Sequence, residues 1–129
     1  MSIKQTVNRA GTPNYLPTPQ SSGGALSRDV ATSYAADGAI QPFNTVAILS
    51  KAGVGAYTLV APLAIQNGQS MRIVSSTAQA HVITFAAGKI NGGALVTATF
   101  GGAIGDSLEI IAFNTVWYTV GGPRNVTIA

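Results

Sequence analysis

The chain has 129 residues, of which 47% are apolar and only 9% are charged, against about 25% charged in an ordinary soluble domain. This length suits a single domain with one core. So few charges are typical of a protein whose surface is largely covered by partners. Cysteine is absent, which excludes disulfides, thiolate nucleophiles and Cys-based metal centres.

The net charge of +3 comes from seven Lys and Arg residues against four acidic ones, and the basic residues stand singly. Binding to a phosphate backbone requires clustered Lys and Arg, so we expect no nucleic-acid partner. Residues 1–25 contain no apolar stretch suited to a signal peptide, and no window approaches the roughly 18 apolar residues of a membrane span. We therefore expect synthesis in a cytoplasm and no association with a membrane.

Residues 1–44 differ in composition from the rest of the chain. They contain the run Gln20-Ser21-Ser22-Gly23-Gly24 and prolines without sustained periodicity, which predicts an extended N-terminal arm. Its apolar residues are too many for a purely solvated linker, so we expect the arm to dock on its own subunit, on a neighbour or on a larger surface. The candidate docking residues are Tyr15, Leu16, Tyr34, Ile40 and Phe43.

From residue 45 to residue 129 the chain consists of short runs of β-branched and aromatic residues separated by Gly, Asn and Asp. This texture is typical of strands joined by tight turns. It predicts an all-β body, an antiparallel sandwich or barrel of about eight strands. The predicted strands are Thr45–Leu49, Ala56–Val60, Ser70–Ser75, His81–Phe85, Leu95–Phe100, Ser107–Phe113, Val116–Val120 and Asn125–Ile128.

The predicted strand 107–113 is apolar on both faces except for Glu109. A strand of this kind has to be covered on both faces, and a body of this size favours the arm or a partner chain as the second cover. We therefore expect an oligomer, with Glu109, Ile111 and Phe113 in the subunit interface. An unpaired buried carboxylate is costly, so Glu109 is expected to meet Arg72, Lys89 or Arg124, or to face solvent.

Residues that carry chemistry are few. His81 is the only histidine, so a site with two histidine ligands is impossible. We interpret it as a core or interface histidine bonded to backbone rather than as the base of a Ser-His-Asp triad with Ser107 and Asp106. Asp106 follows Gly105, where its carboxylate can accept from nearby backbone amides. We expect a protein that is not an enzyme, with no catalytic residue, no cofactor and no metal.

Aromatic side chains are the strongest candidates for a binding surface, because they can stack on sugars or anchor interfaces. Tyr57, Trp117 and Tyr118 are the candidates for binding a glycan, although for Trp117 in a hairpin of this composition a core position is the favoured interpretation.

From Tyr57 to the C-terminus the sequence resembles small β-domains of head decoration proteins, head fibres and some tail-associated proteins of tailed bacteriophages. The resemblance is carried first by Tyr57-Thr58-Leu59, Asn67-Gly68-Gln69 with Met71-Arg72-Ile73, and Ala78-Gln79-Ala80-His81-Val82-Ile83-Thr84. It continues through Ala98-Thr99-Phe100, Gly105-Asp106-Ser107-Leu108, Ala112-Phe113-Asn114, Val116-Trp117-Tyr118 and Asn125-Val126-Thr127-Ile128. Related hairpins usually turn through Asn-Gly, where this chain has Asn114-Thr115.

The resemblance implies a virion component without catalysis, commonly trimeric, on the capsid exterior. It favours a decoration (cement) protein that is made in the host cytoplasm, assembles as a homotrimer and binds the major capsid protein. The alternative is an adhesive module of a head or tail fibre that binds a host-surface carbohydrate through the three aromatic residues named above.

Overall fold

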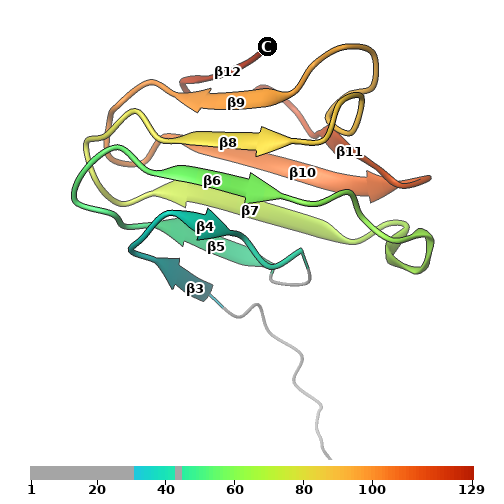
Figure 1. The fold of residues 1–129 in the computed structure, drawn as a ribbon, viewed down its shortest axis with the longest axis horizontal. Helices are drawn as coiled ribbons and strands as arrows, with labels where there is room; N and C mark the ends of the chain where they lie inside the picture. The colour runs from blue at the N-terminus through green and yellow to red at the C-terminus, as the bar shows by residue number, and fades with distance from the viewer. Residues whose placement is uncertain (1–30, 43–44) are drawn as a thin grey trace, which may run out of the picture.

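The computed structural model describes residues 31–42 and 45–129, and within these ranges the protein is all-β (Figure 1). All eight predicted ranges contain a strand, and two further strands precede them. A short 3-10 helix, η1 (Ala64–Gln66), interrupts the loop before β7. The strands are β3 (Ala31–Tyr34), β4 (Gly38–Ala39), β5 (Val46–Leu49), β6 (Ala56–Leu59), β7 (Ser70–Ser75), β8 (Val82–Phe85), β9 (Thr97–Phe100), β10 (Ser107–Phe113), β11 (Val116–Thr119) and β12 (Val126–Ile128).

The strands form two five-stranded sheets that pack face to face (Figure 1). We call the sheet with the order β11-β10-β7-β5-β3 sheet I, and the sheet with the order β12-β9-β8-β6-β4 sheet II. From β3 to β8 each strand lies in the sheet opposite to the strand before it. Strands β3 to β8 therefore wind as a coil of three turns, and each turn adds one strand to each sheet.

The winding corrects the prediction of an antiparallel sandwich of eight strands. In sheet I β3, β5 and β7 run parallel, and in sheet II β4, β6 and β8 run parallel. A parallel neighbour requires a crossover connection, and here the intervening strand of the opposite sheet serves as that crossover. The remaining pairs are antiparallel: β8 with β9, β9 with β12, β10 with β7, and the β10–β11 hairpin. Both sheets are therefore mixed.

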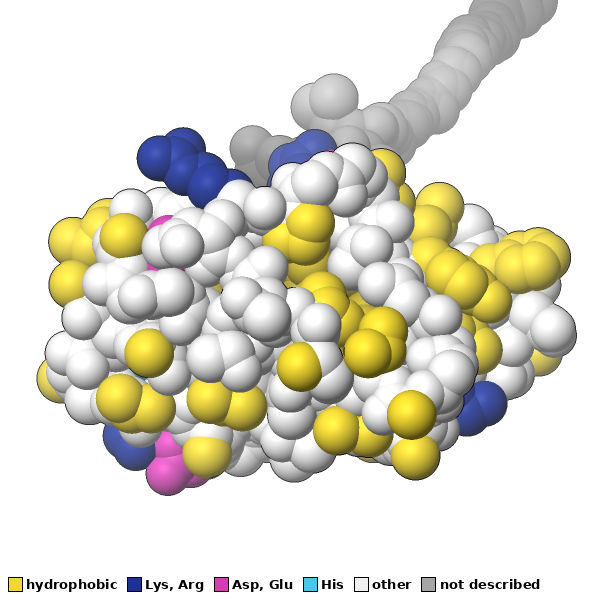
Figure 2. Space-filling model, turned by 90° about the horizontal axis from the view of Figure 1, so that it is seen from above, with side chains coloured by type: hydrophobic (Ala, Val, Ile, Leu, Met, Phe, Trp, Pro, Cys, Tyr) yellow, Lys and Arg dark blue, Asp and Glu magenta, His cyan; other side chains and the backbone are white. Residues whose placement is uncertain are grey.

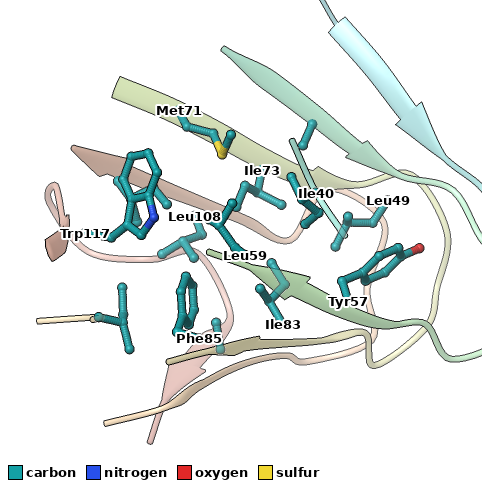
Figure 3. Packing of buried hydrophobic residues seen from close by; sticks show 14 of the residues in the cluster. Ile40, Leu49, Tyr57, Leu59, Met71, Ile73, Ile83, Phe85, Leu108 and Trp117 are labelled. Carbon is teal, nitrogen blue, oxygen red and sulfur yellow. The ribbon is translucent and has the colours of Figure 1, made fainter. Parts of the chain in front are cut away.

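The core lies between the sheets and follows the alternation of side chains along each strand. Every second residue of β7 and β10 is buried, and the same alternation is seen in β6 and β8. Trp117 and Tyr57 lie at opposite ends of this core (Figure 3). The Trp117 indole Nε1–H donates to the carbonyl of Val60 at 2.9 Å, which satisfies the one polar group of this ring.

The hairpin that holds Trp117 turns through two residues with positive φ, Asn114 at 51° and Thr115 at 60°. These values fit the type I′ turn of a two-residue hairpin, which favours Asn-Gly. Asn tolerates this conformation, whereas a β-branched residue is strained by it. Thr115 therefore occupies a position that suits glycine, and its hydroxyl accepts a hydrogen bond from Lys89 Nζ at 3.2 Å.

Residues 31–42 belong to the sandwich, so the predicted arm boundary at residue 44 is wrong for this part of the chain. Ile40 is 1% exposed in the core, and its N–H donates to the carbonyl of Thr58 at 2.8 Å. Tyr34 packs against the same core. Both side chains were predicted to be docking anchors of an arm, but in the structure they pack against the core of their own subunit. The other three candidates, Tyr15, Leu16 and Phe43, lie outside the described residues.

Candidate functional site

The outer face of sheet I is apolar, although it points away from the core. The outward apolar side chains are Val46, Ile48, Val74, Ile111, Phe113, Val116 and Tyr118, with Val120 just after β11. The other outward residues of these strands are Ala31, Ser33, Ser70, Arg72, Ser107 and Glu109. Phe113 is 60% exposed, Val120 45% and Tyr118 38%. Apolar groups gathered in this way mark interaction surfaces. Seen from above the view of Figure 1, hydrophobic side chains are scattered among polar ones, and Lys and Arg lie around the outline (Figure 2).

The outer face of sheet II provides the contrast. Its register places Thr97 beside Thr84 and Thr84 beside Thr58, and Thr127 beside Thr99. A row of threonines is common on a solvent-exposed β-sheet face, because the branched side chain favours the strand conformation and the hydroxyl bonds water. The two faces have the same pleat and come from one chain. The apolar character of the outer face of sheet I is therefore a local property rather than a result of overall composition.

The three residues predicted for a subunit interface lie together on this face. Glu109, Ile111 and Phe113 alternate along β10 with the buried residues Leu108, Ile110 and Ala112. The register places Glu109 directly opposite Arg72 of β7, one of the three basic residues expected near it. The face thus carries one acidic and one basic residue on adjacent strands, and its other outward side chains are apolar except for Ser33, Ser70 and Ser107.

A second exposed apolar group lies at the end of the sandwich where β10 turns into β11. Leu63 is 65% exposed and Ile65 is 88% exposed, both in the loop around η1. Gln66 holds this loop: its Oε1 accepts from Leu63 N at 2.7 Å, and its Nε2 donates to the carbonyl of Pro42 at 3.4 Å. Asn67 Oδ1 accepts from Asn114 N at 2.8 Å, which joins the loop to the β10–β11 turn.

The sequence analysis did not single out this loop as a site. Its signal was the apolar triplet Leu63-Ala64-Ile65 between Pro62 and Asn67-Gly68, which lacks the length and alternation of a strand.

The predicted glycan-binding residues are not brought together. Tyr57 is 1% exposed, and its hydroxyl donates to the carbonyl of Tyr34 at 2.9 Å, while Trp117 is fully buried. A ring buried in a core cannot stack on a sugar, so Tyr57 and Trp117 are not placed to bind a glycan in this conformation. Trp117 occupies the core position that the sequence favoured for it. Only Tyr118 of the three is exposed, and it belongs to the outer face of sheet I.

His81 is fully buried and bonded through both ring nitrogens. Its Nδ1 accepts the N–H of Gly55 at 2.9 Å, and its Nε2 lies 2.9 Å from Thr77 Oγ1. Burial lowers the pKa of His81, and the positive charge of Lys51 lowers it further. The interpretation of His81 as a core residue bonded to backbone agrees with these contacts.

Asp106 is bonded at a turn, as the sequence analysis expected. It is 2% exposed; its Oδ2 accepts from Ala103 N at 2.8 Å and its Oδ1 accepts from Asn125 Nδ2 at 2.9 Å. Burial alone would raise the pKa of this carboxyl, but its several hydrogen-bond donors together outweigh burial and lower the pKa. The Asp106 carboxylate and the His81 ring thus make separate sets of bonds rather than the contacts of a triad.

Comparisons with known proteins found no matching family model, no matching curated protein and no matching solved structure. In residues 31–42 and 45–129, no group of three or more His, Cys, Asp or Glu side chains is placed to hold a metal ion. No helix in this described part of the chain is long and apolar enough to cross a membrane.

Proposed function

We propose that the protein is a non-enzymatic structural component of a phage particle that decorates the outer surface of the capsid and cements it by bridging major capsid subunits. The observation that carries the proposal is the apolar outer face of sheet I, which needs a covering partner. The resemblance of residues 57–128 to phage virion β-domains supports the choice of that partner. The residues that could carry chemistry, His81 and Asp106, are engaged in bonds within the fold, which also favours a structural role.

In this proposal the protein assembles as a homotrimer, with Glu109, Ile111 and Phe113 of each copy at the subunit interface. Burying apolar side chains contributes roughly 25 cal/mol for each Å² removed from water. One face of four or five strands therefore offers a substantial part of the free energy that an oligomer requires. Tyr15 and Leu16, in the segment before β3, contact the capsid.

The cementing effect follows from linkage. A ligand that binds only the assembled lattice stabilises that lattice by mass action. Several arms on one oligomer add avidity, because the second and third contacts form at high effective concentration. No catalytic step is needed, and the oligomer stabilises the mature shell by holding neighbouring capsid subunits together.

The copy number of the chain per virion, relative to the major capsid protein, tests the location. Quantitative mass spectrometry of purified particles should give a ratio near the number of available lattice positions. A far smaller ratio would place the protein in a fibre or tail, and its absence from particles would overturn the virion assignment.

Paired surface variants test the outer face of sheet I. Ile111→Asp places a charge in the centre of that face, while Thr84→Asp places the same charge on the outer face of sheet II. Sedimentation velocity should show the Ile111→Asp protein dissociated and the Thr84→Asp protein associated like the wild type. Circular dichroism should show both variants folded. Unchanged association of a folded Ile111→Asp variant would contradict the interface.

A further inference from the structure

The hydrogen bonds around His81 determine the protonation state of its ring. Gly55 N–H points at Nδ1 at 2.9 Å, so Nδ1 has to carry a lone pair. The Thr77 hydroxyl has one hydrogen and donates it to the carbonyl of Lys51 at 3.1 Å. Thr77 Oγ1 therefore accepts from Nε2–H across 2.9 Å. Only the neutral ring with its proton on Nε2 satisfies all three contacts.

These contacts join two loops at one end of the sandwich. Gly55 and Lys51 belong to the loop of residues 50–55 between β5 and β6, and Thr77 and His81 belong to the loop of residues 76–81 between β7 and β8. Both loops cross from sheet I to sheet II and lie at the same end of the molecule (Figure 1). Through Nδ1 the His81 ring bonds the first loop at Gly55. Through Nε2–H it bonds Thr77 of its own loop, and the Thr77 hydroxyl in turn bonds the first loop at the carbonyl of Lys51.

We propose that His81 is an acid-sensitive latch: its neutral ring holds the 50–55 and 76–81 loops together, and its protonation releases them. A second proton would have to enter on Nδ1. That nitrogen would then face the N–H of Gly55, donor against donor, and the Gly55 amide would lose its buried acceptor. The new charge would also be fully buried, where an ion without a compensating partner is costly.

The groups that face the ring do not offset this charge. The Lys51 ammonium carries the same sign, and it pairs with Asp37 Oδ1 at 2.8 Å. Tyr57 presents its ring in an edge-on arrangement, with centroids 5.7 Å apart. Asp106, on the neighbouring loop, directs its carboxylate to Ala103 and Asn125.

Release of the 50–55 loop would extend to the first turn of the coil. Asp37, in the turn between β3 and β4, accepts hydrogen bonds from Lys51 Nζ and from Ala56 N at 2.8 and 2.9 Å. The Tyr57 hydroxyl bonds the last residue of β3, Tyr34. The latch therefore supports the edge strands β3 and β4, and its opening loosens their attachment to the body.

The direction of the pH effect follows from linkage. The pKa of His81 is lowered by burial first and by Lys51 second, so above pH 6.5 both the latched and the released forms are neutral. Below pH 6.5 the His81 ring takes up a proton in the released form but stays neutral in the latched form. The released population then rises by up to about tenfold for each pH unit, until the lowered pKa of the latched form is reached.

Nuclear magnetic resonance of the full-length protein tests the latch directly, because this is the only histidine. Imidazole ¹⁵N shifts should show the proton on Nε2 at pH 7.5. The protection factor of the Gly55 amide should fall by up to about tenfold per pH unit below 6.5, together with those of the 76–81 loop. A proton on Nδ1, a pKa at or above 6.5, or an unchanged Gly55 protection factor would each overturn the proposal.

The variant His81→Asn provides the matched control. Its Oδ1 can accept the Gly55 N–H and does not titrate, so the fall in Gly55 protection between pH 6.5 and 5 should disappear. Persistence of the same fall in a folded His81→Asn protein would refute the latch. The measurement on the wild-type ring decides the question even if the variant does not fold.

Discussion

Replacement of Trp117 measures how much its side chain, which points from β11 into the core, contributes to the free energy of unfolding. Trp117 is fully buried, and its indole N–H bonds the carbonyl of Val60 at 2.9 Å. Truncation of a buried Trp to Ala costs about 3–5 kcal/mol, from lost transfer energy and the cavity left behind. Trp117→Phe keeps most of the ring packing but leaves the Val60 carbonyl without its donor, so it should cost about 1–3 kcal/mol.

Tyr118→Ala is the control, because the neighbouring residue on the same strand points to the opposite face and is 38% exposed. Its cost should stay below about 1 kcal/mol. Urea and thermal unfolding of all variants should be followed by far-ultraviolet circular dichroism, since the Trp117 variants lack the only tryptophan. Trp117→Ala should lower Tm by roughly 10–25 °C. Equal costs for Trp117→Ala and Tyr118→Ala would refute the assigned register of β11.

Three further changes test local features of the fold. Gly55→Ala would place its Cβ against the Tyr57 ring and should destabilise by about 1–3 kcal/mol in urea unfolding, whereas Gly53→Ala, whose Cβ meets nothing within 4 Å, should stay near wild type. Thr115→Gly should raise stability by about 1 kcal/mol, because it relieves a β-branched residue at φ 60°; a lower Tm would contradict that strain. Asp106→Asn should lower Tm at pH 7, and the difference should shrink toward pH 3. The lowered pKa of Asp106 means that its contribution is present above pH 3.8 and is lost as pH falls through the native pKa.

The positions of the strands were predictable, and their directions were not. The ranges Ser70–Ser75 and Ser107–Phe113 were predicted with the bounds that the structure has, because alternation and turn residues are local signals. Alternation of side chains is the same in a parallel and in an antiparallel strand. Whether β7 pairs with β5 or with β6 depends on contacts between residues far apart in the chain, which no local pattern records.

The short strands β3 and β4 escaped prediction for a related reason. Four residues and two residues are too few to display a period, and the prolines and glycines around them favoured an arm. Ile40 was therefore taken as a docking residue, although it completes the core. The pattern of strand 107–113 did predict the outward side of β10, because Glu109, Ile111 and Phe113 share one face in any strand. The bond between His81 and Gly55 joins residues 26 positions apart and has no signature in either segment.

The coil at the start of the sandwich has a consequence for the order in which the chain folds. Its parallel pairs join distant residues, such as Val46 with Arg72 and Ala56 with Val82, so each requires closure of a long loop before any contact is gained. The β10–β11 hairpin closes through two residues and can form early. Nucleation is therefore expected at the C-terminal half, with the coil added turn by turn toward the N-terminus. Synthesis proceeds in the opposite direction, so β3 and β4 would leave the ribosome before the strands that they pair with.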